Sequence, residues 1–295
     1  MDYLLHILIL IGIYIILSAS LNLIVGYTGL FSIAHAAFFG VGAYCAALMA
    51  LKMSTPFPVN LICAIAFCGI LGALVGIPSL RIHDDYFVLS TFSFQVITLS
   101  LLNNLIGFTG GPMGLPDIPL PTIFGLKISS HPGFLILTIF SSGIILYICK
   151  LIVQSPFGRV LKSIREDEIF TQSVGKNVSA YKILIFIIGA GMASIAGVIY
   201  AYYISFIDPS SFTVMESIFI LTIVIIGGTG SLLGPVAGAV ILVVLPEVFR
   251  FIGLPDSIAA NLRQILYGGL LVIFMIWRPT GLLGEFTSER KGINE

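Results

Sequence analysis

The chain alternates between long apolar runs and short polar breaks. The run from Tyr86 to Gly107 contains no charged residue. A helix of that length covers about 33 Å, which spans the hydrocarbon core of a bilayer. Comparable runs cover residues 4–25, 29–50, 57–80, 133–149, 183–206, 213–230, 231–249 and 265–277. The pattern predicts an all-α integral membrane protein, a polytopic bundle of about eight to ten transmembrane helices.

Composition excludes a water-soluble domain. The 295 residues are 58% hydrophobic and 9% charged, with a mean hydropathy of +1.09, whereas soluble domains average about 25% charged residues. The net charge is zero, so no basic surface indicates nucleic acid, and the expected surroundings are a lipid bilayer. Cys45, Cys63, Cys68 and Cys149 all fall within apolar runs. That placement favours buried apolar cysteines over a disulfide framework or a metal site.

One polar break, residues 150–182, differs from the others in its charge. It carries six of the 14 basic residues, namely Lys150, Arg159, Lys162, Arg165, Lys176 and Lys182. The positive-inside rule places this loop in the cytoplasm. Basic residues near the C-terminus place the tail at 285–295 on the same side, so the loop at 108–132 faces outside. We therefore expect a single transmembrane domain over residues 1–295, with 150–182 as a cytoplasmic loop within it.

The N-terminal half leaves its topology open. Counting backwards through complete spans puts the N-terminus outside. That count requires the short segment from Gly26 to Gly29 to connect two complete helices. A broken or re-entrant segment over 29–44 fits equally well, because glycines interrupt this run, and it would put the N-terminus inside.

Glycines also predict interruptions elsewhere. Gly26-Tyr27-Thr28-Gly29 resembles Gly227-Gly228-Thr229-Gly230, and each follows an apolar run. Matching interrupted segments in two halves are typical of a transport pathway built from repeats, although a four-residue match in a glycine-rich chain also fits chance. Glycine costs about 1 kcal/mol relative to alanine inside a helix. We therefore predict helix breaks at Gly26, Gly29, Gly227, Gly228, Gly230 and Gly234.

The sequence contains no recognisable catalytic motif. The one Gly-Lys pair, Gly175-Lys176, is followed by Asn177 and lacks the spacing of a phosphate-binding loop. The four histidines have no helical metal-ligand spacing, and no Gly-x-Ser-x-Gly sequence occurs. We therefore predict that the chain is not an enzyme and uses no cofactor or metal.

The loop at 150–182 contains a predicted helix. Ser155 and Pro156 are typical of an N-cap and a first helical position, and Gly175 is a natural terminator. Between them, an incomplete apolar stripe is formed by Phe157, Val160, Leu161, Ile164 and Ile169. The pattern predicts one helix over 156–174 at the membrane surface. Two interpretations of this segment remain: a solvated segment of mixed charge, or a docking helix for a cytoplasmic partner.

Several segments together resemble a known family. Ser155-Pro156-Phe157-Gly158-Arg159, then Ile164-Arg165-Glu166-Asp167-Glu168, is similar to the coupling segment of branched-chain amino acid ABC transporter permeases of the LivM type. Other matching segments are Asn22 to Ser32, His35 to Tyr44, Thr109-Gly110-Gly111, Gly227 to Pro235 and Pro279 to Gly284. The resemblance covers nearly the whole chain. It departs at Asp84, where the family usually has glycine, and at Phe170 and Thr171, where it usually has alanine.

The resemblance implies an import permease of the cell inner membrane that has no ATPase activity. It implies a second homologous permease subunit, two cytoplasmic ATPase subunits and a periplasmic substrate-binding protein as partners. The cargo would be a branched-chain amino acid, or a related small amino acid or amide. The residues that it assigns to ATPase coupling are Ser155, Gly158, Arg159, Leu161, Ile164, Arg165, Glu166, Asp167, Glu168 and Gly175.

Polar residues within the apolar runs are candidates for the translocation pathway. These are Asn22, Ser32, His35, Thr91, Gln95, Asn103 and Glu216. The competing interpretation is hydrogen bonding between helices. An alternative function is an ion-coupled secondary transporter of small polar solutes, which would need a relay of acidic or histidine side chains within the membrane. The scatter of the histidine and acidic residues favours the ABC permease.

Overall fold

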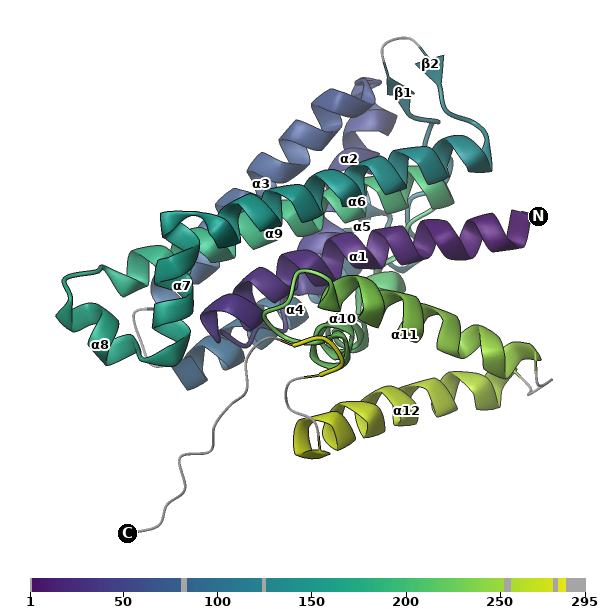
Figure 1. Cartoon of the computed structure of the whole chain (residues 1–295). Helices are drawn as coiled ribbons and strands as arrows, with labels where there is room; N and C mark the ends of the chain where they lie inside the picture. Colours follow the sequence, from purple (N-terminus) through teal and green to yellow (C-terminus); the bar gives the residue numbers. More distant parts are fainter. Residues whose placement is uncertain (1, 81–83, 124–125, 252–255, 278–280, 285–295) are drawn as a thin grey trace.

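The computed structural model describes residues 2–80, 84–123, 126–251, 256–277 and 281–284 (Figure 1). The predicted tail at 285–295 lies outside these residues. The elements in chain order are α1 (Asp2–Thr28), α2 (His35–Met53), α3 (Phe57–Ser79), α4 (Asp84–Asn104), α5 (Ile106–Thr109), η1 (Gly111–Met113), β1 (Thr122–Ile123), β2 (Leu126–Lys127), α6 (His131–Gln154), α7 (Pro156–Glu166), α8 (Glu168–Ser173), α9 (Val178–Ile204), η2 (Pro209–Phe212), α10 (Val214–Gly227), α11 (Gly234–Phe251) and α12 (Asp256–Trp277).

Six of the described helices, α1, α2, α3, α4, α6 and α9, are long and apolar enough to cross a membrane. The apolar helices of α10 and the first part of α11 are shorter. The prediction of an all-α polytopic membrane protein is therefore confirmed. Between α4 and α6, the predicted loop also contains α5, η1 and a short antiparallel ribbon that pairs Thr122 with Lys127.

Helices α1, α2 and α9 form the centre of the bundle, since most of their surface is buried, whereas α3, α4 and α6 remain largely exposed. Small residues allow the central helices to approach closely. A Cβ atom added at Gly42 of α2 would lie 2.6 Å from the Ser194 carbonyl oxygen of α9, and one added at Gly197 would overlap the backbone of Phe39. Close backbone approach between small residues is a common basis of helix packing in lipid.

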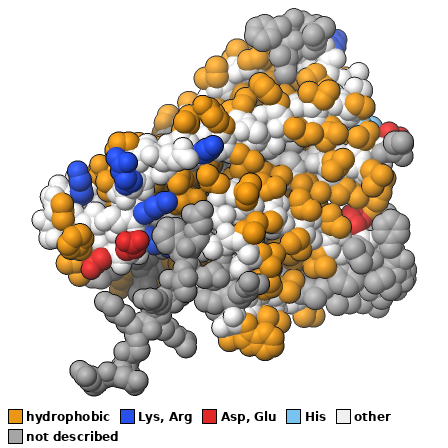
Figure 2. Space-filling model, viewed as in Figure 1, with side chains coloured by type: hydrophobic (Ala, Val, Ile, Leu, Met, Phe, Trp, Pro, Cys, Tyr) orange, Lys and Arg blue, Asp and Glu red, His pale blue; other side chains and the backbone are white. Residues whose placement is uncertain are grey.

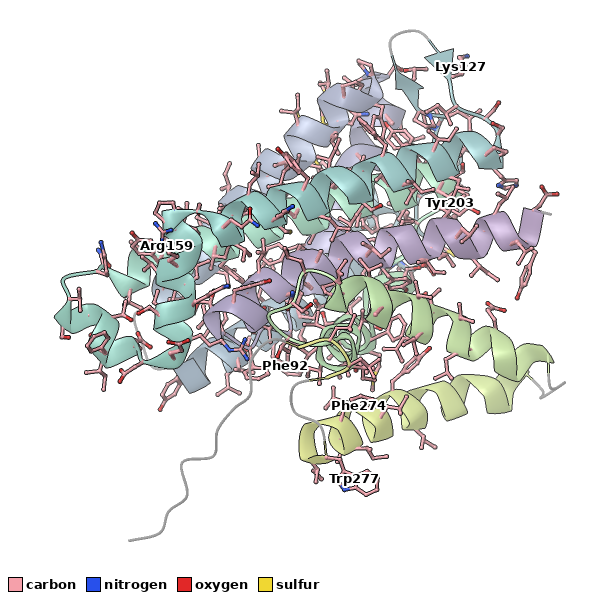
Figure 3. All side chains as sticks on the ribbon, in the orientation of Figure 1. Phe92, Lys127, Arg159, Tyr203, Phe274 and Trp277 are labelled. Carbon is pink, nitrogen blue, oxygen red and sulfur yellow. The ribbon has the colours of Figure 1, made fainter. Side chains whose placement is uncertain are left out.

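The two ends of the bundle differ in character. Helices α7 and α8 project from one end, here called the α7 end (Figure 1). Arg159 lies at this end and Lys127 at the opposite end (Figure 3). The imidazole Nδ1 of His6 lies 2.7 Å from the Tyr203 hydroxyl, near the end of α9. Helix α1 therefore begins at the opposite end and finishes at the α7 end.

The segment at 29–34 turns back into the bundle. Gly29 has a φ of +79°, and the chain is not helical again until His35. The Nε2 atom of His35 lies 3.2 Å from the Ser20 Oγ, and Ser20 is about 12 Å along α1 from Thr28. Helix α2 thus begins well inside the bundle, after a re-entrant, non-helical segment. The N-terminus nevertheless lies at the opposite end from α7, the arrangement expected from counting through complete spans and not the one expected with a re-entrant segment.

Two predictions about local structure are wrong. Gly26 does not break a helix, because α1 continues through Thr28. It is instead a point of close approach, since a Cβ atom there would lie 2.5 Å from the Gly230 amide nitrogen. The expected single helix over 156–174 is divided into α7 and α8. The division falls at Asp167, whose extended backbone ends α7 and whose side chain accepts a hydrogen bond from the Phe170 amide at 2.9 Å.

Candidate functional site

The two glycine-containing breaks lie side by side at the α7 end. Asn22, in α1, is buried and bonds to the segment that follows α10. Its Nδ2 donates to the Ser231 carbonyl at 2.8 Å, and its Oδ1 accepts from the Gly230 amide at 3.0 Å. Gly26 also lies against the Gly230 amide nitrogen, so the two similar four-residue sequences meet in space. Asn22, expected in the pathway, contributes to this junction.

Arg165, in the last turn of α7, contacts both the last turn of α1 and the break that follows α10. One guanidinium nitrogen, Nη1, donates to the Gly26 carbonyl, and Nη2 lies 3.5 Å from the Thr229 Oγ1. Burial lowers the pKa of the Arg165 guanidinium, while Tyr27 and Glu166 oppose that shift. The guanidinium remains protonated at physiological pH. Its planar fork of donors suits it to bridging two acceptors from different segments.

A C-terminal segment also reaches the second break. The amides of Leu282 and Leu283 donate to the carbonyls of Ile226 and Gly227, at 2.9 and 3.0 Å. These carbonyls lie at the end of α10, where they have no partner within the helix. Gly228 has a φ of +120° and Gly281 a φ of +69°. Segments from α1, α7, α10 and the C-terminal region therefore converge on one junction.

The predicted coupling residues divide by exposure. Arg159, Glu166, Asp167 and Gly175 are exposed, Ser155, Arg165 and Glu168 are half-buried, and Gly158, Leu161 and Ile164 are buried. The expectation that Leu161 and Ile164 offer an exposed apolar stripe to a partner is wrong. They are 0% and 4% exposed because α7 packs them against the end of the bundle.

Local bonds fix the orientation of α7 and α8. Ser155 caps α7 by accepting a hydrogen bond from the Gly158 amide at 3.2 Å. Glu168, at the start of α8, forms an ion pair of 2.6 Å with the buried Lys182 of α9. Both helices are thus held against the bundle by their own chain.

An exposed apolar surface lies on α8 and just beyond it. Ile169, Phe170 and Val174 are 80%, 62% and 61% exposed. Next to them is a groove of about 420 Å³, here called the α7–α8 groove, lined by Pro156, Phe157, Arg159, Val160, Ser163, Phe170, Thr171, Val174, Lys176 and Tyr181. Basic and acidic side chains gather at this end, whereas the visible face of the rest of the bundle is mainly hydrophobic (Figure 2).

The sequence pattern places Ile169 in the predicted apolar stripe, and Phe170 and Thr171 depart from the family pattern. Neither signal identified Val174 as part of a contact surface. Phe170 forms part of the exposed apolar surface and lines the groove. Thr171 is buried and bonds to the Ser163 hydroxyl at 2.7 Å.

A buried polar cluster surrounds the start of α2. The Gln95 Nε2 donates to the Phe212 carbonyl at 2.8 Å, and Gln95 Oε1 accepts from Ser217 Oγ at 3.2 Å. Ser217 in turn accepts from the Ala36 amide at 2.9 Å. These bonds connect α4, α10 and the beginning of α2 within the bundle.

Three further pathway candidates belong to the same region. Thr91 accepts a hydrogen bond from the Ile33 amide at 3.3 Å, and Ser32 accepts one from the Ala34 amide at 3.3 Å. His35 contacts Ser20 in α1. Ser32, His35, Thr91 and Gln95 therefore come together, and the bonds that they make fix the re-entrant segment in the bundle.

Two pathway candidates lie apart from this cluster. Asn103 donates to the Leu99 carbonyl of its own helix at 2.9 Å. Glu216, in the first turn of α10, accepts a hydrogen bond of 2.6 Å from the Tyr14 hydroxyl of α1. The structure thus brings four of the seven candidates together, whereas the side chains of Asn22, Asn103 and Glu216 bond to other segments.

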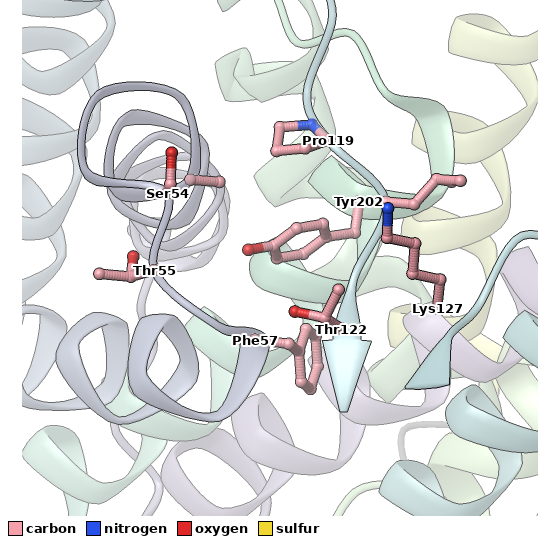
Figure 4. Close-up of a pocket in the computed structure, with 9 residues that line it drawn as sticks. Ser54, Thr55, Phe57, Pro119, Thr122, Lys127 and Tyr202 are labelled. Atoms are coloured by element: carbon pink, nitrogen blue, oxygen red, sulfur yellow. The ribbon is translucent and has the colours of Figure 1, made fainter. Parts of the chain in front are cut away.

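The opposite end contains a second hollow, of about 310 Å³, that the sequence did not indicate (Figure 4). Ser54, Thr55, Lys127 and Tyr202 are among its lining residues. The Tyr202 hydroxyl accepts a hydrogen bond of 2.6 Å from Asn60. Within the described residues, no group of three or more His, Cys, Asp and Glu side chains is arranged to hold a metal ion.

Comparison with known proteins gives consistent matches. The family model described as "branched-chain amino acid transport system / permease component" matches residues 3–275. The LivM permease proteins of the high-affinity branched-chain amino acid transport systems of Salmonella typhimurium and Escherichia coli are each 35% identical over 295 residues, covering 92% of this chain and 68% of the relative. The LivH permease protein of Escherichia coli is 24% identical, covering 92% of this chain and 91% of the relative. No solved structure matches the chain.

Proposed function

Because the chain belongs to the permease-component family of branched-chain amino acid transport systems, we propose that it is a membrane-spanning subunit of an ABC importer. Its cargo is a branched-chain amino acid, or a related small amino acid or amide. The energy comes from ATP hydrolysed by separate subunits, so the chain itself is not an enzyme. Residues 1–295 act as one permease domain of the cell inner membrane.

One observation carries this proposal, namely the double contact of Arg165 with Gly26 and Thr229. A helix outside the bundle is thereby bonded to the last turn of α1 and to the break that follows α10. A force applied to α7 is transmitted directly to the segments where both helices end. That arrangement suits a subunit whose transport is driven from outside its own chain.

The α7–α8 groove and the apolar surface of Ile169, Phe170 and Val174 are the proposed contact for a cytoplasmic ATPase. An exposed apolar patch rimmed by charge is typical of a protein interface. The basic residues of 150–182 support a cytoplasmic position for this end. The N-terminus is then outside, and the tail at 285–295 is cytoplasmic. A second, homologous permease, two ATPase subunits and a periplasmic binding protein complete the importer.

Reconstitution into liposomes tests the proposal. The chain, a homologous permease, the ATPase subunits and a binding protein are combined, and uptake of labelled leucine, isoleucine, valine and urea is measured with ATP. We expect ATP-dependent uptake of at least one of these solutes, and none with an ATPase variant that cannot hydrolyse ATP. Accumulation by the chain alone, driven by a proton or sodium gradient, would instead support a secondary transporter.

A further inference from the structure

The outward face of α4 carries a line of polar side chains. Ser93, Ser100 and Asn104 are exposed and lie seven and four residues apart, which places them on one side of the helix. Ile97, which is 56% exposed, lies on the same line between Ser93 and Ser100, and Val96 and Leu101 flank the line at 43% and 51% exposed. This polar stripe, defined as Ser93, Ser100 and Asn104, runs about 16 Å along the helix axis.

The other peripheral helices expose a different surface. The exposed side chains along the middle of α3 are apolar, including Ile62, Ile70 and Leu74 at 66%, 64% and 65%. In α6 they include Ile136 and Phe140, at 70% and 66%. Such faces suit contact with lipid chains, which offer no hydrogen bonds. Ser93, Ser100 and Asn104, three of the four exposed positions along this line of α4, therefore distinguish it from the faces of α3 and α6.

The stripe occupies the half of α4 that is farther from the α7 end. Helix α4 finishes close to the segment in which Leu115 pairs with Ile207, just beyond the end of α9. Asn104 is thus at the opposite end, which the proposed function makes the outer side. Towards the α7 end, the exposed positions are Phe92, Leu89 and Tyr86, which are apolar or aromatic. The polarity of this face therefore stops at about the middle of the helix.

The stripe is polar without being charged. The Ser93 Oγ donates to the Leu89 carbonyl at 2.8 Å, and the Asn104 Nδ2 donates to the Ser100 carbonyl at 2.8 Å. Donors that bond to their own helix leave a surface of neutral dipoles. Neutral dipoles stabilise water and a zwitterion without the strong binding of a fixed charge, so a solute can enter and leave.

The opposite face of α4 is bonded to the re-entrant segment. Thr91 holds the Ile33 amide, and Gln95 connects to Phe212 and Ser217. A change at the breaks can therefore reach α4 through these bonds. Helix α4 therefore links the re-entrant segment, which bonds to its buried face, with the polar stripe on its exposed face.

We propose that Ser93, Ser100 and Asn104 of α4 line the outer, water-filled half of the translocation pathway, where this chain faces the second permease. The inference rests on the proposed function. The apolar flanks at Val96 and Leu101 close the sides of this half-pathway against the partner, and Leu89 and Phe92 close it towards the cytoplasm.

Thiol accessibility in the assembled transporter tests this placement. Cys45, Cys63, Cys68 and Cys149 are replaced by alanine, and Ser93→Cys and Ser100→Cys are introduced separately. The matched controls are Ile70→Cys and Ile62→Cys on α3, which lie at similar depths and are similarly exposed. A charged, membrane-impermeant thiol reagent is added from the outer side of proteoliposomes without ATP.

We expect both α4 cysteines to react at least about tenfold faster than their α3 controls, because water favours the reactive thiolate over hydrocarbon. Equal rates would overturn the proposal, since the stripe would then lie in lipid or in a dry contact with the partner. ATP-driven uptake by the cysteine-free complex is measured first. Its absence contradicts the proposed function, whereas uptake with unreactive α4 cysteines contradicts only this inference.

A second set of variants serves if a cysteine variant fails to assemble. Ser100→Ala and Ser100→Leu both introduce a residue of high helix propensity. Ile62→Leu is the control on α3. Ser100→Leu is expected to lower uptake at least about fivefold relative to Ser100→Ala, because it places an apolar branch in a wet passage. Equal uptake by these two assembled variants would also overturn the proposal.

Discussion

Asn22 holds the Gly230 backbone through a reciprocal pair of contacts. Its Oδ1 accepts from the Gly230 amide, while its Nδ2 donates to the adjacent Ser231 carbonyl. Asn22 is 2% exposed, so water does not compete for these bonds. An amide side chain supplies both a donor and an acceptor. A single residue of α1 therefore fixes the break that follows α10.

Replacing Asn22 should loosen that break. Asn22→Leu removes both bonds and leaves two buried backbone groups unpaired, at a cost of about 1–3 kcal/mol each. Hydrogen exchange measured on peptides covering 228–233 should become at least about tenfold faster, the equivalent of about 1.4 kcal/mol. Asn103→Leu is the control, because Asn103 bonds within α4, and it should leave exchange in this segment unchanged. Unchanged exchange in Asn22→Leu would contradict the structural role of the pair.

Arg165 should be required for coupling. Arg165→Ala removes the contacts with Gly26 and Thr229, so uptake should fall at least about tenfold, the equivalent of about 1.4 kcal/mol. ATP hydrolysis by the complex should continue. Arg165→Lys should restore uptake only partly, because an ammonium lacks the planar fork that spans both acceptors. Uptake and ATP hydrolysis are measured on the same proteoliposomes.

The control for Arg165 is Lys150→Ala, which removes an exposed basic residue near the end of α6. It should leave both activities close to those of the unmodified chain. If Arg165→Ala transports normally, α7 does not act through the breaks. If ATP hydrolysis and complex assembly are lost together, Arg165 instead supports docking.

Gly228 should tolerate substitution poorly. Its φ of +120° is unfavourable for residues with a side chain, and a Cβ atom there would overlap the Gly284 amide nitrogen. Gly228→Ala should therefore destabilise the protein by about 1–3 kcal/mol. Gly143→Ala is the matched control, since it lies within α6 with nothing within 4 Å of an added Cβ atom. Thermal unfolding in detergent should show a lower midpoint for Gly228→Ala and an equal or higher one for Gly143→Ala. Equal midpoints for the two variants would contradict this prediction.

The sequence predicted the membrane class and most helices, because apolar runs of bilayer length have few other interpretations. It predicted interruptions near both glycine motifs, but not that Gly26 would remain helical. A glycine needed for close approach and a glycine needed for a turn look alike without the neighbouring backbone. Here that neighbour is Gly230, which lies far away in the chain.

The candidate site was less predictable, because its residues act through contacts between distant segments. Leu161 and Ile164 were recognised as apolar, but sequence alone did not reveal which surface would cover them. On α4, the polar residues Thr91 and Gln95 were predicted to line the pathway, and the structure shows that their face is buried. The exposed stripe has similar side-chain chemistry. The packing of α4 against α2, α3 and α10 distinguishes the two faces.

Asp167 should control how α8 presents its apolar surface. Its carboxylate caps α8 at the Phe170 amide, and loss of an N-cap costs about 1 kcal/mol. Asp167→Ala should therefore disorder the short helix and weaken binding of the ATPase about fivefold, whereas Asp167→Asn retains a good capping group and should bind normally. The affinity is measured in detergent with the labelled ATPase and the assembled permease pair.

A second variant distinguishes the loss of the α8 helix from the loss of a direct contact between α8 and the ATPase. Phe170→Ala leaves the Asp167 cap intact but removes an exposed ring from the α7–α8 groove. It should weaken ATPase binding as well, because an aromatic side chain is a common anchor of interfaces. Weaker binding in Asp167→Ala and Phe170→Ala, but not in Asp167→Asn, would support docking on α8. If all three variants bind equally well, the ATPase contacts another part of the α7 end, and the apolar surface on and beside α8 has a different role.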